Sequence, residues 1–403
     1  MNILFISTSK IQHDTYEFIK RELPDAYSIY EIFIKLDGSV NNYSEKNIYN
    51  ILLDLKPNLI VIGNDSIVPI LPFMFLAKEM GIPTLLVQDG IIGAISASGK
   101  NILRQFNQIK YAKSYILAYL NFAKTVTFFT KNPFHCIPLI TKDIFMKSIY
   151  GNTYGMNGST KNALFGNSTR EHFIKRGVST YEIVITGCPR FDYIVNQDRI
   201  FNMADIQSIK NKKILVVTQP FLEDGIWSEN FSNNFMEKLV GQLTIINDAE
   251  IVIKCHPREN IKKYDKYIDR WPNIKFCQNE VLLQQLINEA GVIVGINSTV
   301  LLEALANNKK VVLLNYLGFD DIYGFLRSSC VYLSNSYAEL NDVIARAFNE
   351  QVGCTIENNR KKYVYEQLYA IDGRASTRIV SLMEKLIYSG GITNNQHLHD
   401  EIY

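Results

Sequence analysis

Short apolar runs alternate with amphipathic patterns along most of the chain. The first run, Ile3-Leu4-Phe5-Ile6, ends at the hydroxyl residues 7–9. Apolar runs of this length are typical of strands buried on both faces, whereas apolar positions three or four residues apart indicate helices. Further strands are predicted at residues 59–62, 84–87, 163–165, 183–185, 214–218, 250–253, 274–276, 292–294 and 311–314, and helices at 14–21, 231–242 and 281–288. This alternation predicts an α/β protein whose parallel sheets are built from βαβ units.

The chain is long enough for two domains, because its 403 residues exceed the size at which a single hydrophobic core stops growing. The polar stretch 196–213 is followed by an apolar run that resembles the N-terminus. We therefore expect two doubly wound Rossmann-like domains, 1–205 and 206–374, a helix at 375–388 that crosses back to the first domain, and a flexible tail at 389–403. Two such domains facing one another would bind ligands in an interdomain cleft, outside the carboxyl ends of the strands.

Composition and charge are those of an ordinary globular protein. The apolar content is 47%, the charged content is 20%, and the formal net charge of +2 does not favour a nucleic-acid binder. The six cysteines form no CxxC pair and no metal-ligand spacing, so reduced thiols are expected instead of a zinc site or a disulfide framework. They are Cys136, Cys188, Cys255, Cys277, Cys330 and Cys354.

The apolar runs are too short for targeting or membrane insertion. The N-terminal run lacks the basic region and the cleavage signature of a signal peptide. The longest apolar stretch, 67–77, is about half of a membrane span and contains Pro69 and Pro72. We therefore expect a cytoplasmic protein without a transmembrane helix.

The strongest chemical signal is a strand that leads directly into a His-Pro pair, in the segment 250–260. Proline fixes the backbone and ends the strand, so the imidazole of His256 should lie at the carboxyl edge of a sheet. With Lys254 and Arg258 beside it, this histidine could contact a phosphate or protonate a departing one. The alternative is a histidine that only caps a loop.

A second signal follows the predicted strand 292–294, where Asn297, Ser298 and Thr299 precede a helical segment. Such residues cap helices, and the free N–H groups and positive dipole of a helix N-terminus attract anions. Capping alone is common, so the signal gains weight from its combination with His256.

The two motifs together resemble the donor-binding half of GT-B-fold enzymes of bacterial surface-polysaccharide synthesis. This group includes sialyl- and polysialyltransferases, capsule transferases and CDP-glycerol glycerophosphotransferases. The resemblance implies a GT-B-like fold with an N-terminal acceptor domain and a C-terminal nucleotide-donor domain. By similarity, His256, Ser298 and Thr299 would contact the phosphate and nucleotide of the donor, and Glu303 would bind a ribose or sugar hydroxyl. The remaining residues of the expected donor site are Lys254, Pro257, Arg258 and Asn297.

The stretch 163–192 resembles the segment that closes the first domain in these enzymes and in UDP-N-acetylglucosamine 2-epimerases. There, a Gly-x-Pro-x-x-Asp turn enters the interdomain cleft, and here the turn begins at Gly187. Arg190 within it is a candidate contact for phosphate or acceptor. An alternative of equal weight is that Arg190 is only a surface residue on an interdomain turn.

A general base is sought after the strand 84–87, which ends in Gln88-Asp89-Gly90. The arrangement resembles the acid-acid-glycine motif of bacterial sialyltransferases, and the resemblance implies that Asp89 deprotonates the acceptor hydroxyl. Gln88 departs from that motif, and a loop-capping aspartate is the alternative. Asp65, after the preceding strand, is a second candidate.

No Asp-x-Asp motif occurs in the sequence, so the metal-dependent donor site of GT-A enzymes has no counterpart. We expect a reaction without a metal or other cofactor, in which cationic groups and helix dipoles stabilise the leaving phosphate.

The segment 100–150 combines eight Lys or Arg residues with ten Phe or Tyr residues and a single acidic residue, Asp143. It could bind an anionic membrane surface, which would place the protein at the inner face of the cell membrane, or an acidic acceptor polymer. An ordinary insertion with core aromatics and solvated lysines is the third reading. No nucleic-acid-binding motif accompanies the charge.

The sequence thus predicts a GT-B-type glycosyltransferase. It would move a sugar, or a sugar-like unit, from a CMP-, CDP- or UDP-linked donor to a hydroxyl of a cell-surface glycan or a lipid-linked acceptor, in the synthesis of capsule, lipopolysaccharide or a related polymer. One alternative is a UDP-N-acetylglucosamine 2-epimerase-like enzyme, whose His-Arg-Arg-Glu-Asn signature is echoed at 256–260. Another is an inactive nucleotide-binding subunit of a glycan-assembly complex.

Overall fold

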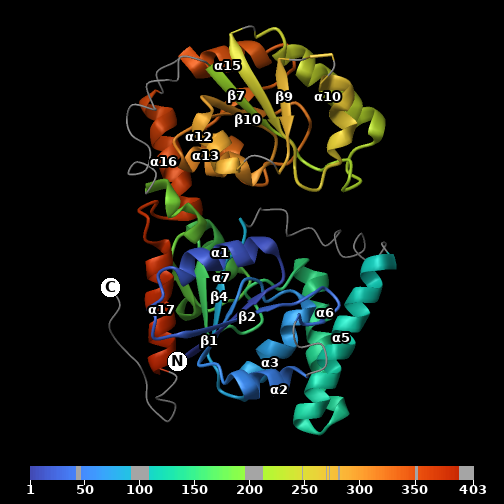
Figure 1. The fold of residues 1–403 in the computed structure, drawn as a ribbon, viewed down its shortest axis with the longest axis vertical. Helices are drawn as coiled ribbons and strands as arrows, with labels where there is room; N and C mark the ends of the chain where they lie inside the picture. The colour runs from blue at the N-terminus through green and yellow to red at the C-terminus, as the bar shows by residue number, and fades with distance from the viewer. Residues whose placement is uncertain are drawn as a thin grey trace. The chain divides into compact units, whose positions relative to one another are not determined.

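The chain forms two compact units in the computed structural model, coloured along the sequence in Figure 1. The first unit combines Met1–Val195 with Gln367–Tyr403, and the second spans Asn196–Glu366. The boundary expected at 205 lies outside the described residues, and residues 367–374 belong to the first unit instead of the second. The described residues are 1–41, 47–91, 109–195, 212–246, 248–268, 270–271, 273–279, 282–349 and 353–389, so most of the expected tail is not among them.

The first unit is built on a six-stranded sheet with the order β2-β1-β3-β4-β5-β6. Every neighbouring pair is parallel, so all its strands end at the same edge. The strand order reverses direction between β1 and β3, which is the kind of switch point where such folds bind ligands. The strands are β1 (Asn2–Ser7), β2 (Ser28–Phe33), β3 (Leu59–Ile62), β4 (Thr84–Val87), β5 (Lys161–Leu164) and β6 (Ile183–Ile185).

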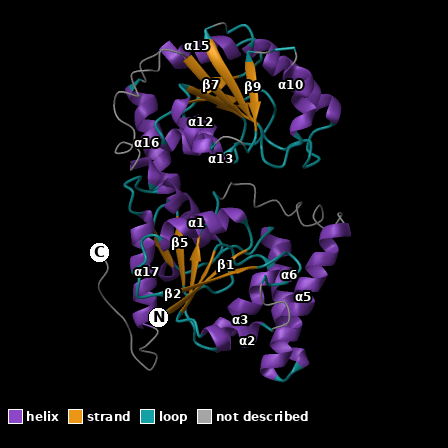
Figure 2. Cartoon of the chain, viewed as in Figure 1, coloured by secondary structure: helices purple, strands orange, loops and turns teal. Residues whose placement is uncertain are grey.

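Both faces of this sheet are buried, because successive strand residues point to opposite sides. Leu4 packs in one apolar cluster with α2 and α3, and Phe5 packs in another with α1 and α17. Figure 2 shows these helices around the orange strands. Their bounds are α1 (Lys10–Lys20), α2 (Ile48–Leu55), α3 (Leu71–Glu79) and α17 (Ala375–Ser389).

The turn after β6 holds α17 to the first unit. The carboxylate of Asp192 accepts hydrogen bonds from the backbone N–H groups of Ala375 (2.9 Å) and Ser376 (2.7 Å). A carboxylate in this position satisfies free N–H groups at the helix N-terminus and interacts favourably with its dipole. Gly187 has a φ of +83°, and a Cβ added there would lie 3.3 Å from the Cβ of Ala375. The turn therefore needs glycine for both conformation and space.

The segment expected to be an insertion contains a pair of helices, whereas residues 100–108 lie outside the described part of the chain. The first helix packs on α3 through Phe75, whose ring meets those of Phe122 and Phe129 edge-on, with centroids 6.4 and 5.9 Å apart. Some of the aromatic residues of this segment are thus core residues. The two helices are α5 (Ile109–Thr130) and α6 (Cys136–Tyr150), and α7 (Asn167–Lys175) follows β5.

The second unit repeats the architecture with a parallel sheet of order β12-β11-β10-β7-β8-β9. The strands are β7 (Lys212–Val217), β8 (Ala249–Lys254), β9 (Ile274–Cys277), β10 (Val292–Gly295), β11 (Lys310–Leu314) and β12 (Tyr332–Ser334). The helices of seven or more residues are α10 (Glu229–Leu243), α12 (Leu283–Glu289), α13 (Thr299–Ala306), α15 (Leu340–Asn349) and α16 (Cys354–Leu368). The expected α/β class with two doubly wound sheets is confirmed.

Two strands escaped prediction, and both lie at sheet edges. β2 contains a single buried residue, Ile32, and β12 is only three residues long. An edge strand needs fewer apolar positions, so its pattern is weaker than that of a central strand.

The cysteines whose side chains are described, at positions 136, 188, 255, 277 and 330, are free thiols. Within the described residues, the structure contains no helix that is both long and apolar enough to cross a membrane.

The cap at α17 gives a testable prediction. Replacing Asp192 by alanine should lower the free energy of unfolding by about 1–2 kcal/mol, because two helix N–H groups lose their acceptor. Urea denaturation followed by circular dichroism measures the change. Asp192→Asn should lower the free energy of unfolding by less, since the amide oxygen of asparagine can still accept a hydrogen bond from one N–H. Equal stability of Asp192→Ala and the parent chain would contradict the cap.

Candidate functional site

In the second unit, the expected donor residues follow two strands that flank β7 in the sheet. His256 follows β8 and Asn297 follows β10. Because the strands are parallel, these residues and Thr218, which follows β7, all lie at the carboxyl edge of the sheet. This edge is where doubly wound folds bind ligands.

His256 is fixed by hydrogen bonds of its own backbone and ring. Its N–H donates to Thr218 Oγ1 (3.2 Å) and Glu259 Oε2 (2.7 Å), and its carbonyl accepts from Gln278 Nε2 (2.7 Å). The N–H of Arg258 donates to His256 Nδ1 (3.2 Å). Since Nδ1 accepts a hydrogen bond, the proton of the neutral ring is on Nε2, which can donate to a ligand.

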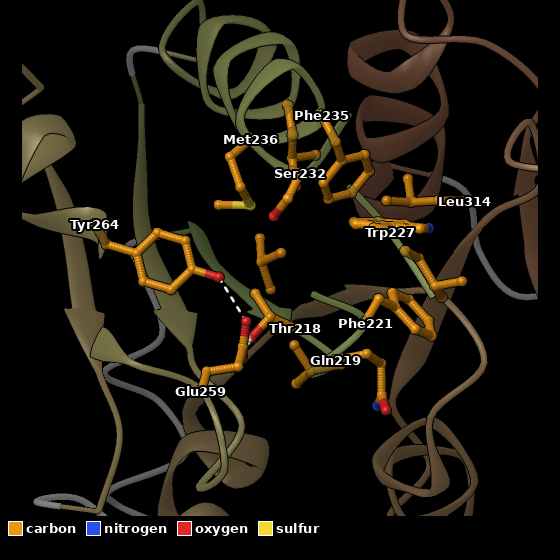
Figure 3. Close-up of a pocket in the computed structure, with 14 residues that line it drawn as sticks. Thr218, Gln219, Phe221, Trp227, Ser232, Phe235, Met236, Glu259, Tyr264 and Leu314 are labelled. Carbon is orange, nitrogen blue, oxygen red and sulfur yellow. Dashed lines mark hydrogen bonds between the residues drawn. The ribbon is translucent and has the colours of Figure 1, made fainter. Parts of the chain in front are cut away.

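Glu259, which was not among the expected site residues, is the buried centre of this network. Its Oε1 accepts from Tyr264 Oη (2.6 Å) and Lys263 Nζ (3.0 Å), while its Oε2 also accepts from the hydroxyl of Thr218. Figure 3 shows Glu259 between Thr218 and Tyr264. The sequence signal was its position three residues after His256, where one turn brings its carboxylate back to the histidine N–H.

The imidazole is held in its neutral form. Burial, followed by the positive charge of Arg258, lowers the pKa of His256 from its ordinary value of 6.5, against smaller opposing effects of Glu259 and Asp224. At neutral pH the ring therefore offers a hydrogen-bond donor at Nε2 instead of a full positive charge.

The basic neighbours of His256 bond to protein groups. Arg258 Nη2 donates to Asp224 Oδ2 (3.0 Å), and Lys254 Nζ donates to the carbonyl of Gln278. Pro257 and Arg258 are exposed. A donor phosphate would have to compete with Asp224 for Arg258, so the two expected cations are less available than the sequence implied.

The second motif begins α13 as expected. Ser298 is its N-cap, and its Oγ accepts from the N–H of Val300 (3.2 Å). Thr299 is exposed in the first turn, Glu303 is half-buried one turn further on, and Asn297 Nδ2 donates to the carbonyl of Asp320 (2.7 Å). Thr299 is thus the more accessible of the two hydroxyls, because Ser298 is only 2% exposed.

An aromatic pocket lies beside this edge (Figure 3). Phe221 and Phe319 stack with their centroids 4.7 Å apart, and Trp227 packs against Phe221. The pocket has a volume of about 20 Å³, which is room for a water molecule and not for a nucleobase. A second small pocket adjoins Asn297 and Asn315.

In the first unit, Asp89 lies at the carboxyl edge, directly after Gln88 at the end of β4. Its Oδ2 accepts a hydrogen bond from Gln12 Nε2 (2.7 Å), and Gln12 Oε1 in turn accepts from the N–H of Thr8 (2.7 Å). A methyl group at Gly63 would lie 2.5 Å from Gln12 Cγ, so the loop after β3 leaves space for this amide. Gln12 is 2% exposed and orients the carboxylate, a role that the sequence did not indicate.

Gln88 occupies the position where the sialyltransferase motif has an acid, and it is fully buried. Its Oε1 accepts from the N–H of Phe165 (2.8 Å), and its Nε2 donates to the carbonyl of Gly90 (2.7 Å) and to Thr169 Oγ1 (3.1 Å). A carboxylate could accept the bond from Phe165 but could not donate to the carbonyl of Gly90, which explains the amide. Gln88 therefore braces the loop that carries Asp89.

Arg190 faces the same region from the turn after β6. Burial raises the pKa of Asp89, while the hydrogen bond from Gln12 and the charge of Arg190 oppose the rise. The Nε of Arg190 is buried without a hydrogen-bond partner, and the structure describes no ion pair between Arg190 and Asp89. Arg190 as a whole is half-buried, so it stays a candidate contact for an anionic ligand near this carboxylate.

Asp65 is a loop anchor and a poor candidate for a base. It is fully buried, and its two carboxylate oxygens accept from the N–H groups of Gly155 (2.7 Å) and Asn157 (2.9 Å). Burial raises its pKa to about 6, although both backbone bonds act in the opposite direction. Two backbone donors favour the ionised form, and the side chain has no path to a substrate.

In the described part of the chain, one cluster has the composition of a metal site, namely His13, Glu17 and Glu31. Lys20 Nζ lies 2.9 Å from Glu17 and 2.6 Å from Glu31. Lys20 is thus already paired with both carboxylates, and His13 Nδ1 lies 2.6 Å from Glu31.

A family model described as alpha-2,8-polysialyltransferase matches residues 21–315 of the sequence. The chain belongs to this polysialyltransferase family. The match includes Asp89, His256, Ser298 and Thr299, and it makes the chain a GT-B-type glycosyltransferase, as expected. Among the curated proteins, none matches the sequence significantly.

The fold of this polysialyltransferase-family chain is also found in three enzymes of known structure. The UDP-GlcNAc 2-epimerase from Neisseria meningitidis bound to UDP-GlcNAc is 12% identical, with a TM-score of 0.58 and coverage of 96% of this chain and 100% of that one. The wall teichoic acid polymerase TagF is 12% identical, with a TM-score of 0.52 and coverage of 96% and 89%. The glycosyltransferase of kitacinnamycin is 11% identical, with a TM-score of 0.53 and coverage of 96% and 99%. At these identities the likeness is one of fold.

The neutral imidazole gives a prediction. Nuclear magnetic resonance titration of His256 should yield a pKa below 6.5. Arg258→Gln should raise that pKa, because a positive charge that disfavours the imidazolium is removed. Arg270→Gln, which removes an exposed arginine paired with Glu237, serves as the control and should leave it unchanged. A pKa above 6.5 in the parent chain would contradict the lowering by burial and Arg258.

Proposed function

We propose that the chain transfers a sialic acid residue from a CMP-linked donor to a hydroxyl of a cell-surface glycan. The observation that carries the proposal is Asp89, a carboxylate held by Gln12 at the ligand-binding edge of the first unit. The family match supports the choice of sugar. We propose that the reaction takes place in the cytoplasm.

Asp89 acts as the general base in this proposal. It takes the proton of the acceptor hydroxyl while that oxygen forms a bond to the anomeric carbon of the donor sugar. The bond between that carbon and the phosphate oxygen breaks, and the nucleotide leaves with the electron pair. The pKa of Asp89 is raised by burial, which makes its carboxylate a stronger base near neutral pH.

The second unit binds the donor phosphate and stabilises its growing charge. His256 donates from Nε2, and the N-terminus of α13 adds backbone N–H groups and the hydroxyl of Thr299. We propose that these groups suffice without a metal ion, since the sequence has no Asp-x-Asp motif. Arg190, whose charge acts on Asp89, would contact an anionic group of the acceptor or donor.

An epimerase-like reaction is the main alternative, because the echo of its signature at 256–260 coincides with a shared fold. It requires no acceptor. Consumption of UDP-N-acetylglucosamine in the absence of acceptor would favour it over transfer. An inactive binding subunit, the other alternative, would turn over neither substrate.

Substitution of the two central residues tests the mechanism. Asp89→Asn should lower the transfer rate by about 10²–10⁴-fold while the donor still binds, because only the proton acceptor is lost. His256→Ala should lower it by about 10²–10³-fold. The measurement is release of nucleotide in the presence of a glycan acceptor. Asp25→Asn, an exposed aspartate before β2, is the control. Native activity in both variants would show that Asp89 and His256 are not the active-site residues.

The donor is tested by thermal unfolding with CMP, CDP, UDP and GDP, each in the presence of EDTA and again with Mg²⁺. CMP should stabilise the chain most, by about 2.7 kcal/mol at 100 times its dissociation constant. The stabilisation should be the same under both conditions. A stabilisation that vanishes with EDTA would mean that a metal ion binds with the nucleotide.

A further inference from the structure

The helix α5 has two stripes of side chains on opposite sides. Ala118, Phe122 and Val126 are buried in an apolar cluster with Val68 and Leu71 of the first unit. These positions are four residues apart, as expected for one face of a helix. The inner face is therefore committed to the fold of the first unit.

The outer stripe of α5 is apolar as well. Ile116, Leu117, Leu120 and Phe128 have exposed fractions of 59%, 39%, 51% and 44%. They recur at spacings of three, four and eight residues, about half a turn away from the buried positions. A helix whose outer face is exposed to water normally carries polar residues there. An exposed apolar stripe is typical of a surface that binds a protein or a membrane.

The apolar surface continues through the turn into α6. Phe134 is 73% exposed, Phe145 is 63% exposed, and Ile137, Ile144 and Ile149 are each about half exposed. Phe134 lies in the short connection between the helices, and the other four lie along α6. We call the exposed apolar residues of α5, the connection and α6 the hairpin surface.

Lysines are interspersed with these apolar residues, and acidic groups are not. Lys113, Lys124, Lys131 and Lys142 are exposed. The single carboxylate of the segment, Asp143, is buried and bonds to Lys147 Nζ (2.7 Å) and Tyr119 Oη (2.7 Å). Within residues 109–150, no exposed carboxylate therefore compensates the charge of these lysines.

We propose that the hairpin surface docks on an anionic membrane. Lysines attract the headgroups of acidic lipids, and exposed Ile, Leu and Phe side chains enter the boundary between headgroups and acyl chains. An acidic polysaccharide in water would pair with the lysines but would leave the apolar side chains in water. A second copy of the chain would bring lysines against lysines if the same surface met itself. Of these three occupants, the membrane is the one that satisfies both features.

This docking is independent of the proposed transfer reaction, because none of its residues belongs to the site around Asp89 or His256. The full chain is tested by cosedimentation with vesicles of phosphatidylcholine, with and without phosphatidylglycerol. Binding should need the acidic lipid and should weaken as salt is raised.

Two pairs of substitutions separate the contributions. Phe134→Ser with Phe145→Ser should lower vesicle binding at least about tenfold, through loss of inserted apolar area. Lys124→Gln with Lys142→Gln should lower it about thirtyfold, because each lysine near an acidic lipid surface contributes to binding. Ile245→Ser with Leu282→Ser, which removes exposed apolar residues of the second unit, is the matched control and should bind as the parent chain does.

Two further readouts keep the result interpretable. The unfolding midpoint of each variant should equal that of the parent chain, since the replaced side chains are exposed. Transfer to a soluble acceptor should also be unchanged. The proposal is overturned if the parent chain ignores acidic vesicles, or if the serine pair binds them normally. It is also overturned if a soluble acidic polysaccharide binds the parent chain and the serine pair equally and displaces both from vesicles.

Discussion

Parallel pairing of the strands is the constraint on which the rest of this structure depends. Parallel strands must all end at one edge, so residues far apart in sequence become neighbours there without any long loop. In the second unit Thr218, His256 and Asn297 lie at the same edge this way, and in the first Gln12 reaches Asp89. Each unit thereby concentrates polar groups at a single edge and leaves its two faces apolar.

The loops at these edges have few regular hydrogen bonds of their own, and buried polar side chains replace them. Gln88, Asp65 and Glu259 each bond to at least one backbone N–H and to a further group from another part of the loop or a neighbouring element. An unsatisfied buried N–H is costly, so such a side chain both stabilises the loop and fixes its shape. Asp89 and His256 are proposed to contact substrate. They are held in place by neighbouring residues that have no proposed contact with it.

Much of the fold was visible in the sequence, because central strands buried on both faces leave continuous apolar runs. The edge strand β2 was missed because most of its side chains are exposed and only one, Ile32, is buried. At the candidate site, the position of His256 after its strand could be predicted from the His-Pro pair. The role of Gln12 could not, because it depends on contact with a residue 77 positions away and on the space left at Gly63. The pairing of Arg258 with Asp224 was hidden for the same reason.

The attachment of α17 to the first unit has a consequence for biosynthesis. This helix covers one face of the first sheet and is capped by Asp192, which precedes it by 183 residues. During translation, the strands of the first sheet leave the ribosome long before the helix that covers them. Part of that apolar face must stay uncovered while the whole second unit is synthesised, at a rate of about 5–20 residues per second. The nascent chain is thus exposed to aggregation for that interval, and the first unit cannot complete its core until α17 has been made.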